Sequence, residues 1–86
     1  MAGQYEFHVG GFVSRIVYRK LGDKIYLTHT EVPAPLEGKG IASMLVKKAL
    51  EDIRQKGLRL VPLCPFVIRY VQRHPEWESL ILKEEK

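Results

Sequence analysis

A glycine loop directly before an amphipathic segment is the feature of the sequence that most strongly suggests chemistry. Gly38 and Gly40 stand immediately ahead of a helical pattern that begins at Ile41. Glycine adopts positive φ at little cost, so the backbone can approach a ligand closely, and the first helical amides, up to Ser43, have no intrahelical acceptor. These donors and the positive end of the helix dipole attract anions. The loop therefore predicts a phosphate-binding corner, with a simple tight turn as the equally weighted alternative.

Cys64, the single cysteine, is the second group that could do chemistry. Pro65 suits the first turn of a helix, which places the thiol at a helix N-terminus, where the dipole lowers the pKa of a thiol and favours the nucleophilic thiolate. The alternative is a small buried hydrophobe, because cysteine is among the most buried residue types. One cysteine cannot form an internal disulfide, and histidines that are scattered singly disfavour a zinc site.

His29 is a candidate general base, because imidazole titrates near neutral pH and an amine nucleophile must lose a proton. The alternative is a histidine packed within a strand. Alternation over residues 25–32 predicts a strand with Ile25, Leu27, His29 and Glu31 on one face. Glu31 could then orient His29 or act as a second base, and otherwise it is a solvated charge at the strand end.

Three β-rich runs must position these groups. Alternating patterns and β-branched or aromatic residues predict strands over 5–9, 12–18 and 25–32, and glycine turns separate them. Such short connections predict an antiparallel meander. Pro33 and Pro35 end the third strand, because proline cannot donate to the ladder, and lead the chain into the glycine loop.

The second half of the chain predicts a crossover. Apolar residues recur at helical spacing over 41–56, and Gly57 supplies the helix stop. A short apolar run over 58–63 predicts a fourth strand parallel to the third, because a helix connects the two. A second helix begins at Pro65 and ends at His74 before a proline. Its expected inner face consists of Phe66, Val67, Tyr70 and Val71.

Length and composition fit one small α/β (α+β) domain over residues 1–86, with a mixed sheet. The 86 residues are 45% hydrophobic and 28% charged, which is typical of a globular chain with one core. The tail over 77–86 predicts an anchoring segment followed by a frayed charged end. No apolar run approaches a membrane span, and the N-terminus lacks a signal-peptide pattern, so we expect a cytoplasmic protein without a membrane partner.

The order and spacing of several short motifs resemble those of a known superfamily. The segments are Thr28-His29-Thr30-Glu31-Val32-Pro33, Gly38-Lys39-Gly40-Ile41-Ala42, Pro62-Leu63-Cys64, and Tyr70 through His74-Pro75. Together they resemble the GNAT superfamily of acetyl-CoA-dependent N-acetyltransferases, and within it the minimal single-domain branch. The resemblance covers nearly the whole chain and implies a GNAT-like fold.

The resemblance also implies a set of site residues. It implies acetyl-CoA as co-substrate, His29 and Cys64 in the active site, and Tyr70 as proton donor to the departing CoA thiolate. No metal is expected, because the histidines are scattered singly. On the pattern alone, Tyr70 is as well explained as a core aromatic paired with Phe66. The cofactor-binding residues that the resemblance implies are Val32, Gly38, Lys39, Gly40, Ile41, Ala42 and Ser43. Acetyl transfer by direct attack, with His29 as base, and transfer through Cys64 are both open.

Two rival functions follow from other features. The acidic Glu37 beside the expected pyrophosphate, and a chain too short for the helices that usually shape an acceptor groove, fit a CoA-binding module with little catalysis; a homodimer could supply the missing wall. A net charge of +4 fits a nucleic-acid-binding domain, but the basic residues are interspersed with acidic ones, which disfavours it. The acceptor amine could belong to a protein lysine, an N-terminus, a polyamine or a small metabolite.

Overall fold

Three antiparallel strands form the first half of the sheet, as the alternation predicts. The computed structural model describes residues 2–82 and contains β1 (Ala2–Val9), β2 (Phe12–Leu21) and β3 (Lys24–Glu31). Gly10 and Gly22, in the two connecting turns, have φ of 59° and 61°, which favours glycine there. The predicted meander is confirmed, and β1 and β2 extend further than the sequence pattern indicates.

The second half adds a crossover helix and a parallel strand. The chain continues through η1 (Ala34–Leu36) and α1 (Ile41–Gln55) to β4 (Arg59–Pro62), which pairs in parallel with β3. It then forms α2 (Pro65–Arg73) and the 3-10 segment η2 (Pro75–Leu80). The sheet order is β1-β2-β3-β4, so the predicted mixed sheet with a parallel fourth strand is confirmed.

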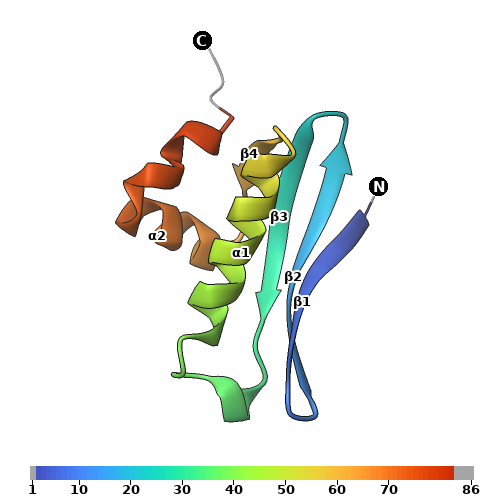
Figure 1. The fold of residues 1–86 in the computed structure, drawn as a ribbon, viewed down its shortest axis with the longest axis vertical. Coiled ribbons are helices and arrows are strands. Elements are labelled where there is room, and N and C mark those ends of the chain that lie inside the picture. Colours follow the sequence, from blue (N-terminus) through green and yellow to red (C-terminus); the bar gives the residue numbers. More distant parts are fainter. Residues whose placement is uncertain (1, 83–86) are drawn as a thin grey trace.

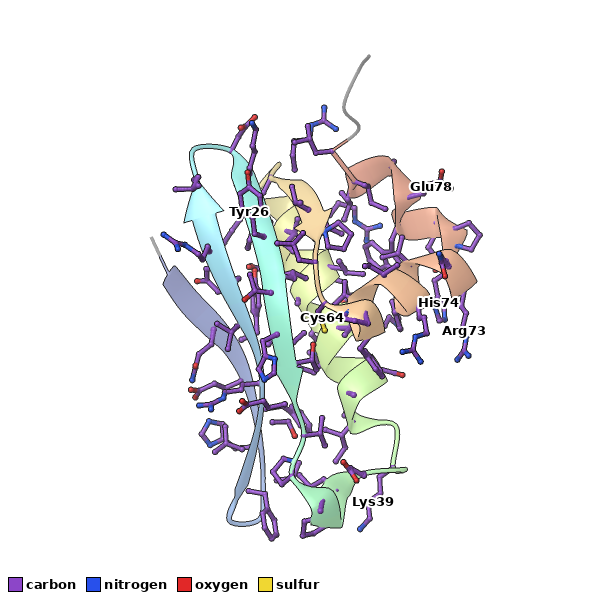
Figure 2. The ribbon with its side chains drawn as sticks, turned by 180° about the vertical axis from the view of Figure 1, so that it is seen from behind. Tyr26, Lys39, Cys64, Arg73, His74 and Glu78 are labelled. Atoms are coloured by element: carbon purple, nitrogen blue, oxygen red, sulfur yellow. The ribbon has the colours of Figure 1, made fainter. Side chains whose placement is uncertain are left out.

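The hydrophobic core lies between one face of the sheet and the helices. Figure 1 shows α1 crossing that face and α2 beside it. Within residues 2–82 no helix covers the opposite face, which is turned toward the viewer in Figure 2. The predicted anchor in the tail is confirmed by Trp77, which is buried in η2 beneath the guanidinium of Arg54. The fully buried apolar side chains are Ile16, Ile25, Leu27, Val46, Ala49, Leu50, Ile53, Leu60 and Val67.

Residues 2–82 contain neither a membrane-spanning helix nor a cluster of metal ligands. No helix among them is both long and apolar enough to cross a bilayer. No three of their His, Cys, Asp and Glu side chains gather as a set of metal ligands. The charged end that the sequence predicts to fray, residues 83–86, lies outside the described residues.

A hydrogen bond fixes the edge strand β1 to α1. The Tyr5 hydroxyl donates to Asp52 Oδ2 at 2.8 Å, and Asp52 also pairs with Lys56. Burial, followed by this hydrogen bond, raises the pKa of Tyr5, so the phenol remains a donor at neutral pH. We expect Tyr5→Phe to lower the free energy of unfolding by about 1 kcal/mol in urea denaturation, because a part-buried carboxylate loses its donor.

Tyr26→Phe is the matched control, because Tyr26 is also half-buried but lies on the open face of the sheet, and its hydroxyl makes no hydrogen bond that involves residues 2–82. Its substitution should leave the unfolding midpoint unchanged. Equal losses in the two variants would show that the Tyr5 hydrogen bond contributes nothing specific.

Candidate active site

The strands β3 and β4 part at the C-terminal end of β4. They pair from Lys24 opposite Arg59 to Leu27 opposite Pro62, and β3 then runs on to Glu31 while the other strand turns into α2. The carbonyl of Leu27 accepts hydrogen bonds from the amides of both Leu63 and Cys64, at 3.0 Å each. The end of β3 beyond Leu27 therefore has no β4 partner, which leaves backbone groups on that edge for a ligand.

An open cavity of about 550 Å³ lies where the strands part and α1 begins. It is lined by Thr30, Glu31, Val32, Leu36, Glu37, Gly38, Gly40, Ile41, Ala42, Ser43 and Phe66. Six of the seven predicted cofactor-binding residues are in this lining, and Lys39, on the same loop, is the exception (Figure 2). The structure thus brings the end of β3 and the start of α1 to one cavity, as the sequence predicts.

The glycine loop leaves the N-terminus of α1 free of protein acceptors. Gly38 and Gly40 have φ of 78° and 74°, so the predicted left-handed conformation is confirmed. No side chain caps the helix, and its first turn holds no acidic residue. The amides of Ile41, Ala42 and Ser43 therefore carry the partial positive charge of the helix end into the cavity wall. An anion bound there stays a prediction.

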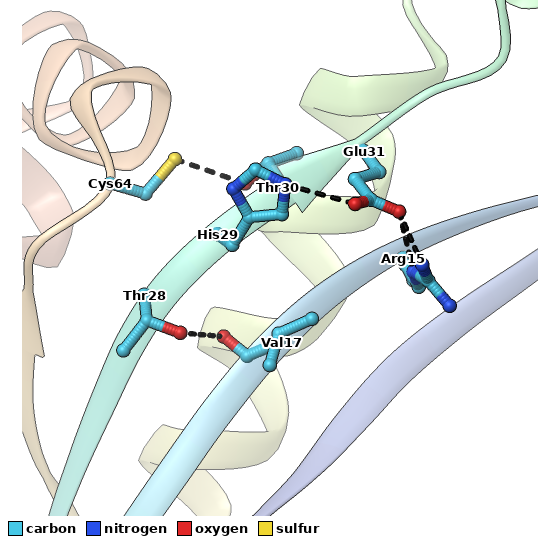
Figure 3. A network of polar contacts seen from close by, with 7 residues as sticks. All are labelled: Arg15, Val17, Thr28, His29, Thr30, Glu31 and Cys64. Atoms are coloured by element: carbon cyan, nitrogen blue, oxygen red, sulfur yellow. Dashed lines mark hydrogen bonds and ion pairs between the residues drawn. The ribbon is translucent and has the colours of Figure 1, made fainter.

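Cys64 lies at the N-cap of α2, as predicted, and is 6% exposed. Its Sγ–H donates to Thr30 Oγ1 at 3.2 Å (Figure 3). Burial opposes ionisation, but the hydrogen bond with Thr30 and the neighbouring amides of Val67 and Phe66 outweigh it, so the pKa of the thiol lies below its ordinary value. Neither amide makes a capping hydrogen bond with the sulfur. The environment therefore makes the thiol easier to ionise than an ordinary cysteine.

Thr30 is the site residue that sequence reasoning missed. It lines the cavity and is the partner of Cys64, yet the sequence pattern gave it no role in the site. The order of the parallel strands could have pointed to it. A threonine near the C-terminal end of one strand and a cysteine just past the end of its parallel neighbour meet at the same edge.

A β-bulge in β3 overturns the predicted face of His29. Val17 on β2 pairs with His29, but the next residue, Tyr18, pairs with Leu27, so Thr28 is an extra residue. The Thr28 hydroxyl donates to the carbonyl of Val17 at 3.2 Å. The bulge reverses the alternation, so the prediction that His29 and Glu31 share a face with Ile25 and Leu27 is wrong. Both lie on the open face, whereas Thr30 lies opposite the buried Ile16.

On that open face His29 belongs to a row of polar contacts. Its Nε2 is 3.0 Å from Glu31 Oε2, and Arg15 Nε donates to Glu31 Oε1 at 2.7 Å (Figure 3). The hydrogen bond from Arg15, and secondarily the contact with His29, holds the pKa of Glu31 below its usual range. The His29 side chain is 60% exposed. An ionised Glu31 can orient the imidazole, and this role stays a prediction.

Tyr70 lies apart from the cavity that holds the glycine loop. It is buried in α2 and stacks on His74, with ring centroids 4.1 Å apart. Burial, followed by the charges of Glu76 and Glu51, raises the pKa of its phenol. The inner face of α2 contains Val67, Tyr70 and Val71 as predicted, but Phe66 is 37% exposed, so its assignment to that face is wrong. The chain turns Phe66 toward the cavity, because it lies in the first turn beside the parted strands.

The fold agrees with comparisons to known proteins. A sequence model of the GCN5-related N-acetyl-transferase family matches residues 4–80, so the chain belongs to that family. It is 35% identical over 75 residues to Protein NATD1 of Mus musculus, covering 84% of this chain and 68% of that protein. Protein NATD1 of Danio rerio is 31% identical over 70 residues, covering 78% and 64%.

A solved structure shares the fold. The NMR structure of a GCN5-like protein from Staphylococcus aureus superposes with a TM-score of 0.68 over 93% of this chain and 89% of the other, at 21% identity. The α+β architecture with three antiparallel strands and a parallel fourth is therefore that of a GNAT domain, as the sequence resemblance implies.

Proposed function

We propose that this chain transfers the acetyl group of acetyl-CoA to a primary amine. The observation that carries the proposal is the single cavity that joins the uncapped start of α1 to the gap between β3 and β4. The first feature suits a pyrophosphate and the second suits an extended pantetheine chain, because one offers free amides and the other a free strand edge. Family membership supports the same reaction class.

In the proposed complex the pyrophosphate lies on the amides of Gly40 to Ser43. The pantetheine pairs with the free edge of β3 near Val32 and carries the thioester toward Thr30 and Cys64. Glu37, which is negatively charged, lies in the same lining. In the proposed complex the pyrophosphate is therefore bound by backbone amides rather than by side chains. Lys39 lies on the loop but outside the lining, so we assign it only a partial neutralisation of the pyrophosphate charge.

The acceptor enters from the open face of the sheet, where His29 and Glu31 lie. The amine nitrogen attacks the thioester carbonyl, and His29 accepts its proton directly or through water. The C–N bond forms, the C–S bond breaks, and the CoA sulfur leaves as a thiolate that takes up one proton. In this arrangement solvent supplies that proton, because Tyr70 lines a neighbouring cavity and not the one assigned to the thioester. The role of Tyr70 as donor stays a prediction from the family resemblance. The acceptor and acetyl-CoA thus approach from opposite sides of β3, which suits direct transfer.

Transfer through Cys64 is the second candidate, supported by the lowered pKa of its thiol. The thiolate would attack the thioester, release CoA and hold the acetyl group until the amine attacks it. Burial of Cys64 and its absence from the cavity lining favour the direct route. We therefore expect Cys64→Ser to retain at least about half of the wild-type kcat, because serine also donates a hydrogen bond to Thr30. An acetyl adduct on Cys64 in intact mass spectra, with an inactive serine variant, would establish the covalent route instead.

The first test is calorimetric titration with acetyl-CoA and CoA, followed by transfer assays with labelled acetyl-CoA. The acceptor panel should contain lysine peptides, N-terminal amines, polyamines and small amines. Saturable binding with transfer supports the proposal. Binding with intact acetyl-CoA across the panel would favour a CoA-binding module, and the absence of binding would overturn both.

A further inference from the structure

A second cavity adjoins the first and carries two arginines. Its volume is about 130 Å³, and its walls are formed by Ser43, Phe66, Arg69, Tyr70, Arg73 and His74. Ser43 and Phe66 line both cavities, so they form the boundary between them. A volume of this size is well below that of a site for a whole nucleotide, which is typically ~300 Å³ or more. It suits a single small group attached to a ligand in the first cavity.

The charge of the second cavity selects an anion. Arg69 and Arg73 are four residues apart on α2, so their side chains share one helix face, and no carboxylate lines the cavity. Neither arginine forms a salt bridge with a carboxylate of residues 2–82. Two like charges at this spacing repel unless an anion lies between them. Figure 2 shows Arg73 and His74 at the end of α2 away from Cys64.

The kinds of donor in the lining suit a phosphate group. Guanidinium groups bind phosphate through parallel N–H donors, and the Ser43 hydroxyl on the shared wall adds a neutral donor. The exposed ring of Phe66, on the same boundary, offers an apolar surface to a base or a ribose. A ligand with a diphosphate at the start of α1 and a further phosphate a short distance away would occupy both cavities.

We propose that the second cavity binds the 3′-phosphate of CoA, so that Arg69 and Arg73 make the chain discriminate CoA from 3′-dephospho-CoA. The inference rests on the proposed function, because it requires the diphosphate of CoA in the first cavity. It assigns no catalytic role to either arginine. Loss of both should weaken CoA binding and leave ligands that lack the 3′-phosphate unaffected.

The test is calorimetric titration of the whole chain with CoA and with 3′-dephospho-CoA. The wild-type chain is expected to bind CoA about tenfold more tightly than 3′-dephospho-CoA, because one charge-assisted contact is worth about that factor. In the double variant Arg69→Gln/Arg73→Gln the ratio should fall to about one, through loss of CoA affinity alone. The control Lys24→Gln/Lys48→Gln removes the same charge outside the second cavity and should keep the tenfold ratio.

Three results would overturn the inference. A wild-type chain that binds both ligands equally, or a double arginine variant that keeps the tenfold ratio, would exclude the 3′-phosphate from this cavity while leaving the proposed function intact. A wild-type chain that binds neither ligand would overturn the proposed function itself, and this inference with it. Far-ultraviolet circular dichroism of the double variant checks that the exposed arginines are not needed for folding.

Discussion

Replacing His29 with glutamine is expected to lower kcat/KM for an amine acceptor about a hundredfold, with CoA affinity unchanged. Glutamine can keep a hydrogen bond to Glu31, but it cannot accept the proton of the attacking amine, and general base catalysis contributes ~10²-fold or more. CoA affinity should persist because His29 does not line the cavity of the glycine loop. Initial rates with labelled acetyl-CoA, together with calorimetry of CoA binding, measure both quantities.

The chain contains a closely matched control for this substitution. His8 on β1 also lies on the open face and has its Nε2 3.0 Å from the carboxylate of a glutamate two residues away, Glu6. It differs from His29 in lying on the far edge strand of the sheet, away from the gap between β3 and β4. His8→Gln should therefore leave the rate unchanged. An equal loss in both variants, or a fully active His29 variant, would exclude His29 as the base.

The elements of the fold could be predicted because each follows a local rule. Glycine turns, alternating residues and helical spacing all act over a few positions, and the helical connection requires a parallel β4. The positive φ at Gly38 and Gly40 was predictable for the same reason, since only glycine adopts it freely. The cavity lining at the start of α1 followed from these local features.

The arrangement of the catalytic candidates could not be predicted, because it depends on strand register. The extra residue Thr28 is defined by pairing with β2, and no count along β3 alone reveals it. It turns His29 to the open face and brings Thr30 to Cys64. The sequence therefore suggested candidate residues, whereas the side of the sheet on which each of them lies required the structure.

The second cavity could not be predicted from the sequence either, because it depends on how the helices pack. Arg69 and Arg73 share a helix face in any reading of α2, but such a pair usually forms a solvated surface. Their proximity to Ser43 arises only when α1 and α2 pack together. Tyr70 lines this second cavity, whereas Cys64 lines neither cavity, although both belong to one short segment.

Replacing Gly40 with valine is expected to lower CoA affinity about a hundredfold. A valine at φ of 74° costs about 1–2 kcal/mol of stability, and it should relax the loop and redirect the amides that begin α1. Misdirecting two charge-assisted hydrogen bonds, at about 1.5 kcal/mol each, gives the expected loss. Apart from the two chain neighbours, no heavy atom lies within 4 Å of the added Cβ, so the expected cost comes mainly from the backbone conformation.

Gly57→Val separates the loss of binding from the loss of stability. Gly57 follows the other end of α1 and has φ of 67°. Apart from its chain neighbours, it also has no heavy atom within 4 Å of an added Cβ. Both variants should therefore lose about 1–2 kcal/mol in urea denaturation, but only Gly40→Val should lose CoA affinity by calorimetry. If both lost affinity equally, the effect would be one of global stability. If Gly40→Val kept full CoA affinity, the pyrophosphate would not bind at the start of α1, because the left-handed turn at Gly40 orients the amides there.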